Sequence, residues 1–146
     1  MFFVGLLLPL PIGLFLIRIR HADLPLSLLG LASVPVLTWG AALGLKIGPC
    51  EVGPCMSHTQ HTHLVIAIVA FGLLIAAFAV LAFVGKTAGG GLLIVAQLVG
   101  AYSMIKTDTA AAVMLLLFAI AAAGYLITGY MAARETQRVP DYPPVA

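Results

Sequence analysis

The sequence predicts an all-α integral membrane protein, a polytopic helix bundle with about five transmembrane helices. Hydrophobic residues make up 62% of the 146 residues and charged residues 8%, whereas roughly a quarter of the residues in soluble domains are charged. The twelve charged residues lie at or beyond the ends of five apolar runs. A chain with so few polar groups cannot cover a soluble core, so the apolar runs are expected to face lipid.

The five runs are predicted as spans because a helix needs roughly 20 apolar residues to cross the hydrocarbon core. The first run is the shortest, is interrupted by Pro9 and Pro11, and ends before Arg18. Between the third and fourth runs, Lys86 and its four flanking glycines are expected to form a turn, because the surrounding apolar stretch is too long for one crossing. The predicted spans are about residues 2–17, 25–47, 64–85, 89–105 and 110–133.

The basic residues predict the orientation, because Lys and Arg are enriched in the short loops on the inner face of a membrane. Five of the seven fall on one side of the predicted topology and two on the other: Arg18, Arg20, Lys86, Arg134 and Arg138 against Lys46 and Lys106. The amino terminus is therefore predicted outside and the carboxyl terminus inside. Tyr102 and Tyr130 fall near opposite ends of their spans, where amphipathic rings are expected at the two interfaces.

The chain divides into a transmembrane domain, residues 1–133, and a tail, residues 134–146. Three prolines in the tail predict an extended, proline-rich cytoplasmic segment. The expected location is the inner (cytoplasmic) membrane of a bacterium, with the loop between spans two and three on the outer face.

That outer loop holds both cysteines and three of the four histidines. In an oxidising compartment Cys50 and Cys55 are expected to form a disulfide, because the glycine and proline between them can turn the chain. Ser57 and Gln60 have the spacing of a capping box, in which two side chains satisfy free backbone amides at a helix start. A helix is therefore predicted to begin here.

A metal site is the first alternative for the loop, since thiolate, thioether and imidazole groups suit copper or zinc. His58 and His61 are three residues apart and would share one face of a helix, whereas His63 would point elsewhere. The candidate metal ligands are Cys50, Cys55, Met56, His58 and His61.

A second alternative is a thiol–quinone oxidoreductase built on the cysteine pair. Membrane enzymes of that kind use a Cys-x-x-Cys active site and a second cysteine pair, whereas this chain has a single Cys-x4-Cys pair. A haem would need a histidine within a span or one from a partner, and His63 is the candidate donor in this chain.

Inside the predicted spans, polar side chains are few and none is ionised at neutral pH. Gln97, halfway along the fourth span, is expected to hydrogen-bond to a neighbouring helix backbone or, alternatively, to contact the head group of a lipid, quinone or pigment. Small residues four positions apart let helix backbones approach closely and predict packing faces in the second and fifth spans. These residues are Gly40 and Gly44, and Ala119 and Ala123.

The functional expectation follows from these features. Ion pumps and proton-coupled carriers keep an ionisable group at mid-membrane depth, and here every charge lies at a run end. Neither a nucleotide-binding loop, a nucleophile with a base, nor a basic patch for nucleic acid is visible. The sequence therefore favours a small accessory or structural subunit over an enzyme. The larger complex is expected to be energy-transducing, in respiratory or photosynthetic electron transfer.

The expected partners are other membrane subunits of a hetero-oligomeric complex, together with lipids. No cofactor of its own is predicted for the chain. A lipid, quinone or pigment bound at the interface with partners stays open.

Overall fold

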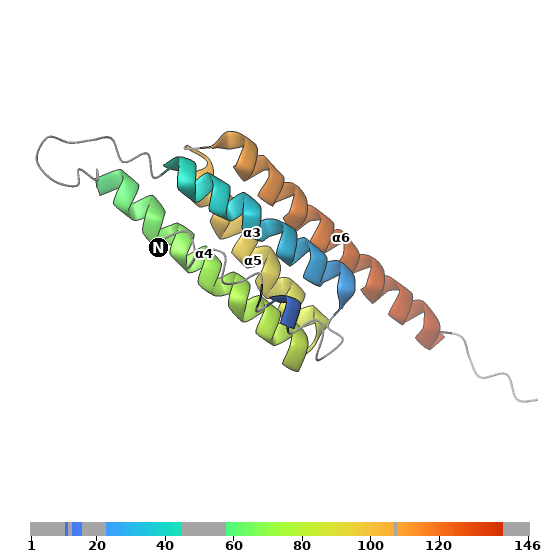
Figure 1. Ribbon diagram of the computed structural model, residues 1–146. Helices are drawn as coiled ribbons and strands as arrows, with labels where there is room; N and C mark the ends of the chain where they lie inside the picture. Colours follow the sequence, from blue (N-terminus) through green and yellow to red (C-terminus); the bar gives the residue numbers. More distant parts are fainter. Residues whose placement is uncertain (1–10, 12, 16–22, 45–57, 107, 139–146) are drawn as a thin grey trace, which may run out of the picture.

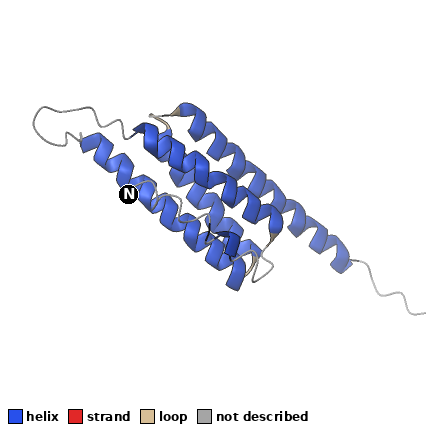
Figure 2. Cartoon of the chain, in the orientation of Figure 1, coloured by secondary structure: helices blue, strands red, loops and turns tan. Residues whose placement is uncertain are grey.

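The structure is a computed structural model that describes residues 11, 13–15, 23–44, 58–106 and 108–138. In this part of the chain the backbone is helical and contains no strand (Figure 2). Four helices have described bounds: α3 (Leu24–Gly44), α4 (His58–Phe83), α5 (Lys86–Met104) and α6 (Thr109–Arg138). The predicted all-α class is therefore confirmed for the described residues.

The four helices run alternately up and down, and α5 packs against α3, α4 and α6 (Figure 1). Helix α3 also packs against α4 and α6, which flank α5. One end of the bundle holds the starts of α3 and α5 with the ends of α4 and α6. We call it the Lys86 end, and the opposite end, where α5 finishes, the Lys106 end.

Within the described part of the chain, three helices are long and apolar enough to cross a membrane, over Val65–Phe83, Lys86–Met104 and Thr109–Thr136. Helix α3 is 21 residues long, and its described side chains are apolar over Leu24–Trp39 apart from two serines and a threonine. The 19 residues of α5 rise about 28 Å, close to the roughly 30 Å of a hydrocarbon core. The 30 residues of α6 rise about 45 Å, so α6 projects past the other helices at the Lys86 end (Figure 1).

Helices α3 to α6 occupy the segments predicted as spans two to five, and the first predicted span lies mostly outside the described residues. Helix α4 begins at His58, where the Ser57 and Gln60 spacing predicts a helix start. Helix α6 ends at Arg138, so the extended tail does not begin at residue 134. Arg, Glu and Gln are good helix formers, and Pro140 is the first residue of the tail whose ring opposes a helix.

The connection between α4 and α5 is short, and a single glycine lies in it. Gly85 has a φ of 141°, a conformation that side chains with a Cβ rarely adopt. Helix α5 begins directly afterwards at Lys86, so the next three glycines are helical and not part of the turn as predicted. Gly89 has a different role, because a Cβ there would lie 2.6 Å from the backbone nitrogen of Leu81. This glycine lets α4 and α5 touch backbone to backbone.

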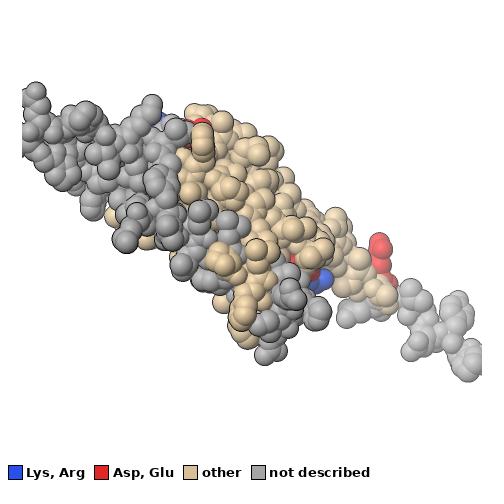
Figure 3. Space-filling model, viewed as in Figure 1, with Lys and Arg blue, Asp and Glu red and all other residues tan. Residues whose placement is uncertain are grey.

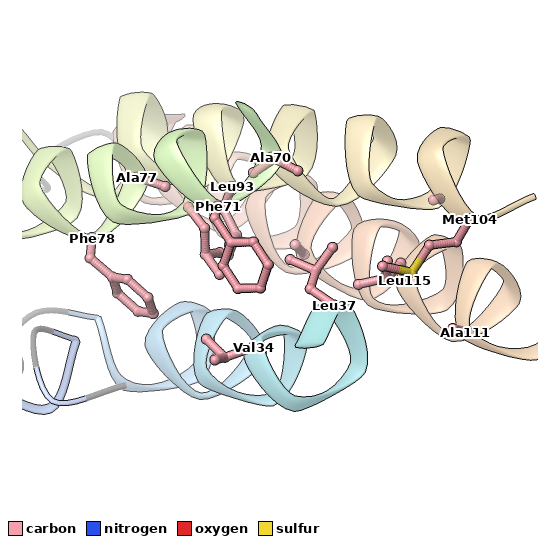
Figure 4. Packing of buried hydrophobic residues seen from close by; sticks show 14 of the residues in the cluster. Val34, Leu37, Ala70, Phe71, Ala77, Phe78, Leu93, Met104, Ala111 and Leu115 are labelled. Carbon is pink, nitrogen blue, oxygen red and sulfur yellow. The ribbon is translucent and has the colours of Figure 1, made fainter. Parts of the chain in front are cut away.

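The core is filled by apolar side chains from all four helices (Figure 4). Phe78 of α4 packs against Gly30 of α3, where a Cβ would lie 2.8 Å from the ring. Gly100 of α5 accommodates Leu37 of α3 in the same way, with a Cβ position 2.5 Å from the end of that side chain. Glycines therefore make the room that large side chains of neighbouring helices fill.

Candidate functional site

The cysteine and histidine loop falls largely outside the described residues. Cys50, Cys55 and Met56 lie there, so the disulfide, the metal site and the redox pair stay predictions. His58 and His61 belong to the helical start of α4, but their side-chain surroundings also lie outside the description. Among the described residues, no group of three His, Cys, Asp or Glu side chains is placed to hold a metal ion.

His63 is the histidine of this region whose surroundings are described. Its side chain is half-buried on α4, close to the Lys106 end, and its Nδ1 is buried without a hydrogen-bond partner. An imidazole nitrogen in this state can accept a hydrogen bond or bind a metal.

The interior of the described bundle contains four buried polar side chains, all uncharged: Ser27, Ser33, Gln97 and Ser103. Ser103 Oγ donates to the carbonyl of Gly100 in its own helix, at 2.7 Å. Ser27 Oγ has no partner. Hydroxyl and amide groups such as these hydrogen-bond but do not titrate near neutral pH.

Gln97 and Ser33 join α5 to α3 in the middle of the bundle. Gln97 Nε2 donates to Ser33 Oγ at 2.9 Å, and Ser33 Oγ donates to the Leu29 carbonyl at 2.8 Å. The partner of Gln97 is thus a side chain of a neighbouring helix and not the helix backbone that the sequence predicts. Gln97 Oε1 is buried and unpaired, which costs free energy in an apolar core.

The sequence contains a weak signal for this pair. Ser33 and Gln97 are polar residues near the middle of their spans, and polar residues there are expected to find partners on other helices. Nothing in the sequence says which of them meet, because that depends on how α3 and α5 are rotated about their axes.

Two contacts at the Lys86 end involve tyrosines of α6. The Tyr125 hydroxyl donates to Asp23 Oδ1 at 2.9 Å and links the start of α3 to α6. The guanidinium carbon of Arg134 lies 4.9 Å from the ring centroid of Tyr130, within cation–π range. In the view of Figure 3, charged side chains lie toward the ends of the described surface and the middle is uncharged.

Of the three long helices, α6 is covered least by the described part of the chain. About 28% of its apolar window is buried, against 50% for α5. Ala119 is buried inside the bundle and Ala123 is half-buried, so the predicted small-residue face of this helix turns toward the chain itself. Gly124 is exposed, and a Cβ there would meet nothing within 4 Å.

The other predicted packing pair, Gly40 and Gly44, belongs to the last turns of α3. The contacts of these two glycines lie outside the described residues.

Comparison with protein-family models, curated proteins and solved structures finds no match for this chain. The class that the fold supports is a helical protein with apolar helices of membrane-spanning length.

Proposed function

We propose that this chain is a small accessory or structural transmembrane subunit of a larger membrane complex. The observation that carries the proposal is the uneven covering of its spans. Helix α5 is enclosed by three helices of the same chain, whereas α6 turns a long apolar face outward. We expect the complex to be energy-transducing, in respiratory or photosynthetic electron transfer, because small polytopic subunits are frequent in such assemblies.

The outward face of α6 has the shape that a partner helix needs. Leu117, Ala121, Gly124 and Thr128 are exposed and lie on one face by their three- and four-residue spacing. Three of these four residues are small, so another helix backbone could approach closely. The Thr128 hydroxyl already donates to the Tyr125 carbonyl at 3.0 Å. The face therefore presents van der Waals surface without an unmet donor.

The buried polar groups also suit a structural role. The Gln97 and Ser33 hydrogen bond holds two helices together, and the buried hydroxyls and amide remain neutral at physiological pH. A subunit that fills space between a partner and lipid needs such fixed helix contacts.

The proposal is tested by placing a large side chain on the outward face. Gly124→Leu should push a partner helix away by several ångström and release the chain from its complex in mild detergent. Gly72→Leu is the matched control, because Gly72 is an exposed glycine of α4 with nothing within 4 Å of its Cβ position. Native mass spectrometry of complexes purified from the source membrane measures the composition. Retention of all subunits by Gly124→Leu, or a chain purified alone without any variant, contradicts the proposal.

The two alternative functions are separated by reconstitution of the purified chain in lipid vesicles. Movement of copper or zinc would make it a metal-handling protein that uses the outer loop. Quinone-dependent thiol oxidation would make it a thiol–quinone oxidoreductase. In either case Cys50→Ser should abolish the activity, and the accessory-subunit proposal would be wrong.

A further inference from the structure

The end of α6 extends beyond the helices that surround it (Figure 1). Gly129 lies near the start of α5, since a Cβ at Gly90 would lie 2.9 Å from the Leu126 side chain and a Cβ at Gly129 would lie 3.8 Å from Lys86 Nζ. Residues 130–138, which we call the α6 overhang, continue the helix past this level. At 1.5 Å per residue the overhang is about 14 Å long.

The length of α5 places the overhang relative to a bilayer. This helix rises about 28 Å and has Lys86 at its start and Lys106 just after its end, so it matches a hydrocarbon core of about 30 Å. The head-group layer on each side is about 5 to 8 Å thick. Tyr130 then lies at the edge of the hydrocarbon, and Arg134, about 7.5 Å beyond Gly129, lies among the head groups.

One face of this part of α6 carries apolar side chains nearer the bundle and a cation nearer the carboxyl end of the helix. Ile127, Tyr130, Met131 and Arg134 share that face by their spacing, and the first three are 55%, 60% and 61% exposed. Among the described residues no carboxylate pairs with the Arg134 guanidinium, which stacks on the Tyr130 ring. Stacking leaves the N–H groups at the edge of the guanidinium free to bind an oxyanion.

The structure describes the side chains of two basic residues at the Lys86 end, Lys86 and Arg134. The acidic residues described there are Asp23 and Glu135.

The two acidic groups of this end that the structure describes leave the cationic face intact. Asp23 accepts a hydrogen bond from Tyr125. Glu135 is the next residue after Arg134 and points about 100° away from it around the helix.

We propose that the Tyr130 and Arg134 pair binds the phosphate of an anionic phospholipid in the leaflet at the Lys86 end. Tyr130 contacts the acyl-chain boundary and Arg134 donates to the phosphate oxygens. The proposal rests on the membrane placement of the helices and is independent of whether the chain belongs to a complex.

The test uses the purified full-length chain in mild detergent. Native mass spectrometry measures the dissociation constants of dioleoyl phosphatidylglycerol and dioleoyl phosphatidylcholine. Arg134→Gln should weaken phosphatidylglycerol binding about fivefold, the effect of one basic side chain at an anionic surface. Phosphatidylcholine binding should weaken less, because its choline ammonium offsets the charge of the same phosphate group. Lys106→Gln is the matched control, since it removes one exposed cation at the opposite end, and less than a twofold change is expected.

Two further variants keep the test decisive. Arg134→Lys retains the charge and should retain the preference for phosphatidylglycerol to within about twofold. Tyr130→Leu removes the stacking ring but keeps an apolar side chain, and should weaken binding by about twofold. Both side chains are exposed, so the helical circular dichroism and melting temperature should match those of the unaltered chain.

Two results would overturn the proposal. One is a wild-type affinity of Arg134→Gln for phosphatidylglycerol; if that variant also loses a protein that co-purifies with the unaltered chain, the overhang is assigned to a protein partner. The other is an equal loss of phosphatidylglycerol affinity in Lys106→Gln. Gly124→Leu leaves the overhang unaltered, so failure of the accessory-subunit proposal is detected separately.

Discussion

Helices α5 and α6 have opposite surroundings within one bundle. Helix α5 is the least apolar of the three long helices and the most buried, with three helices of the same chain around it. Helix α6 is more apolar and mostly exposed. Lipid accepts any large apolar side chain, whereas a neighbouring helix requires small residues and paired polar groups. Between these two helices the more apolar one is the less covered, and glycines and a glutamine of α5 lie where the other helices touch it.

The largest effect that tests this contrast is expected at Gly89. Gly89→Ala places a Cβ 2.6 Å from the Leu81 backbone nitrogen, which cannot move without separating α4 from α5. The loss of stability should be about 2 to 3 kcal/mol, as for other overpacked sites. Gly91→Ala on α5 and Gly124→Ala on α6 are controls, because both positions are open. Reversible unfolding of the purified chain in detergent measures the free energy of unfolding of the three variants. Equal losses of stability in all three would contradict the expected difference between the buried face of α5 and the open positions.

A smaller effect is expected where α5 meets α3. Ser33→Ala leaves Gln97 Nε2 buried without its acceptor, and should cost about 1 to 2 kcal/mol in the same unfolding assay. Combining it with Gln97→Leu should recover most of that loss, because the replacement also removes the unpaired Oε1.

Thr38→Val provides the control for this pair. Its hydroxyl donates to the Val34 carbonyl of its own helix, at 2.8 Å, and not to another helix among the described residues. If Thr38→Val lowers the unfolding free energy as much as Ser33→Ala does, the hydrogen bond between α3 and α5 contributes no more to stability than a bond within one helix.

The smallest effect is expected on the exposed side, at Tyr125. Tyr125→Phe removes the hydrogen bond to Asp23 but keeps the ring, and should lower the unfolding free energy less than Ser33→Ala does, because water and head groups compete for both partners. Tyr102→Phe, at an exposed position of α5, should leave the unfolding free energy unchanged. A loss for Tyr125→Phe as large as that for Ser33→Ala would show that the exposed α6 contact is as strong as the buried one.

The sequence predicts the helices well because apolar length and short connections are properties of the chain alone. The segments of α3 to α6 follow from that pattern, and their alternate up-and-down order follows from the spans. The pattern fails at the end of α6. Hydropathy falls after Ala133, but Arg134 and the next residues form a good helix without being apolar.

The sequence predicts side-chain contacts less well because they depend on helix rotation. Two glycines of the same short segment illustrate this: Gly85 lies in a turn and Gly89 in a helix contact, and composition does not distinguish them. Ala119 and Gly124 are another example, since a rotation of the helix decides which one faces the bundle. The predictions for Cys50 and its loop concern residues that the structure does not describe.

The close join at Gly85 and Gly89 has a consequence for how the protein is made. Helices α4 and α5 are neighbours in sequence, so the loop that must close between them is very short and its entropic cost is small. The contact between Ser33 and Gln97 spans 64 residues. As the chain leaves the ribosome, α4 and α5 should enter the bilayer together as a hairpin. Helix α3 is synthesised earlier, and it should pack against this hairpin only after Gln97 has been inserted and can donate its hydrogen bond to Ser33.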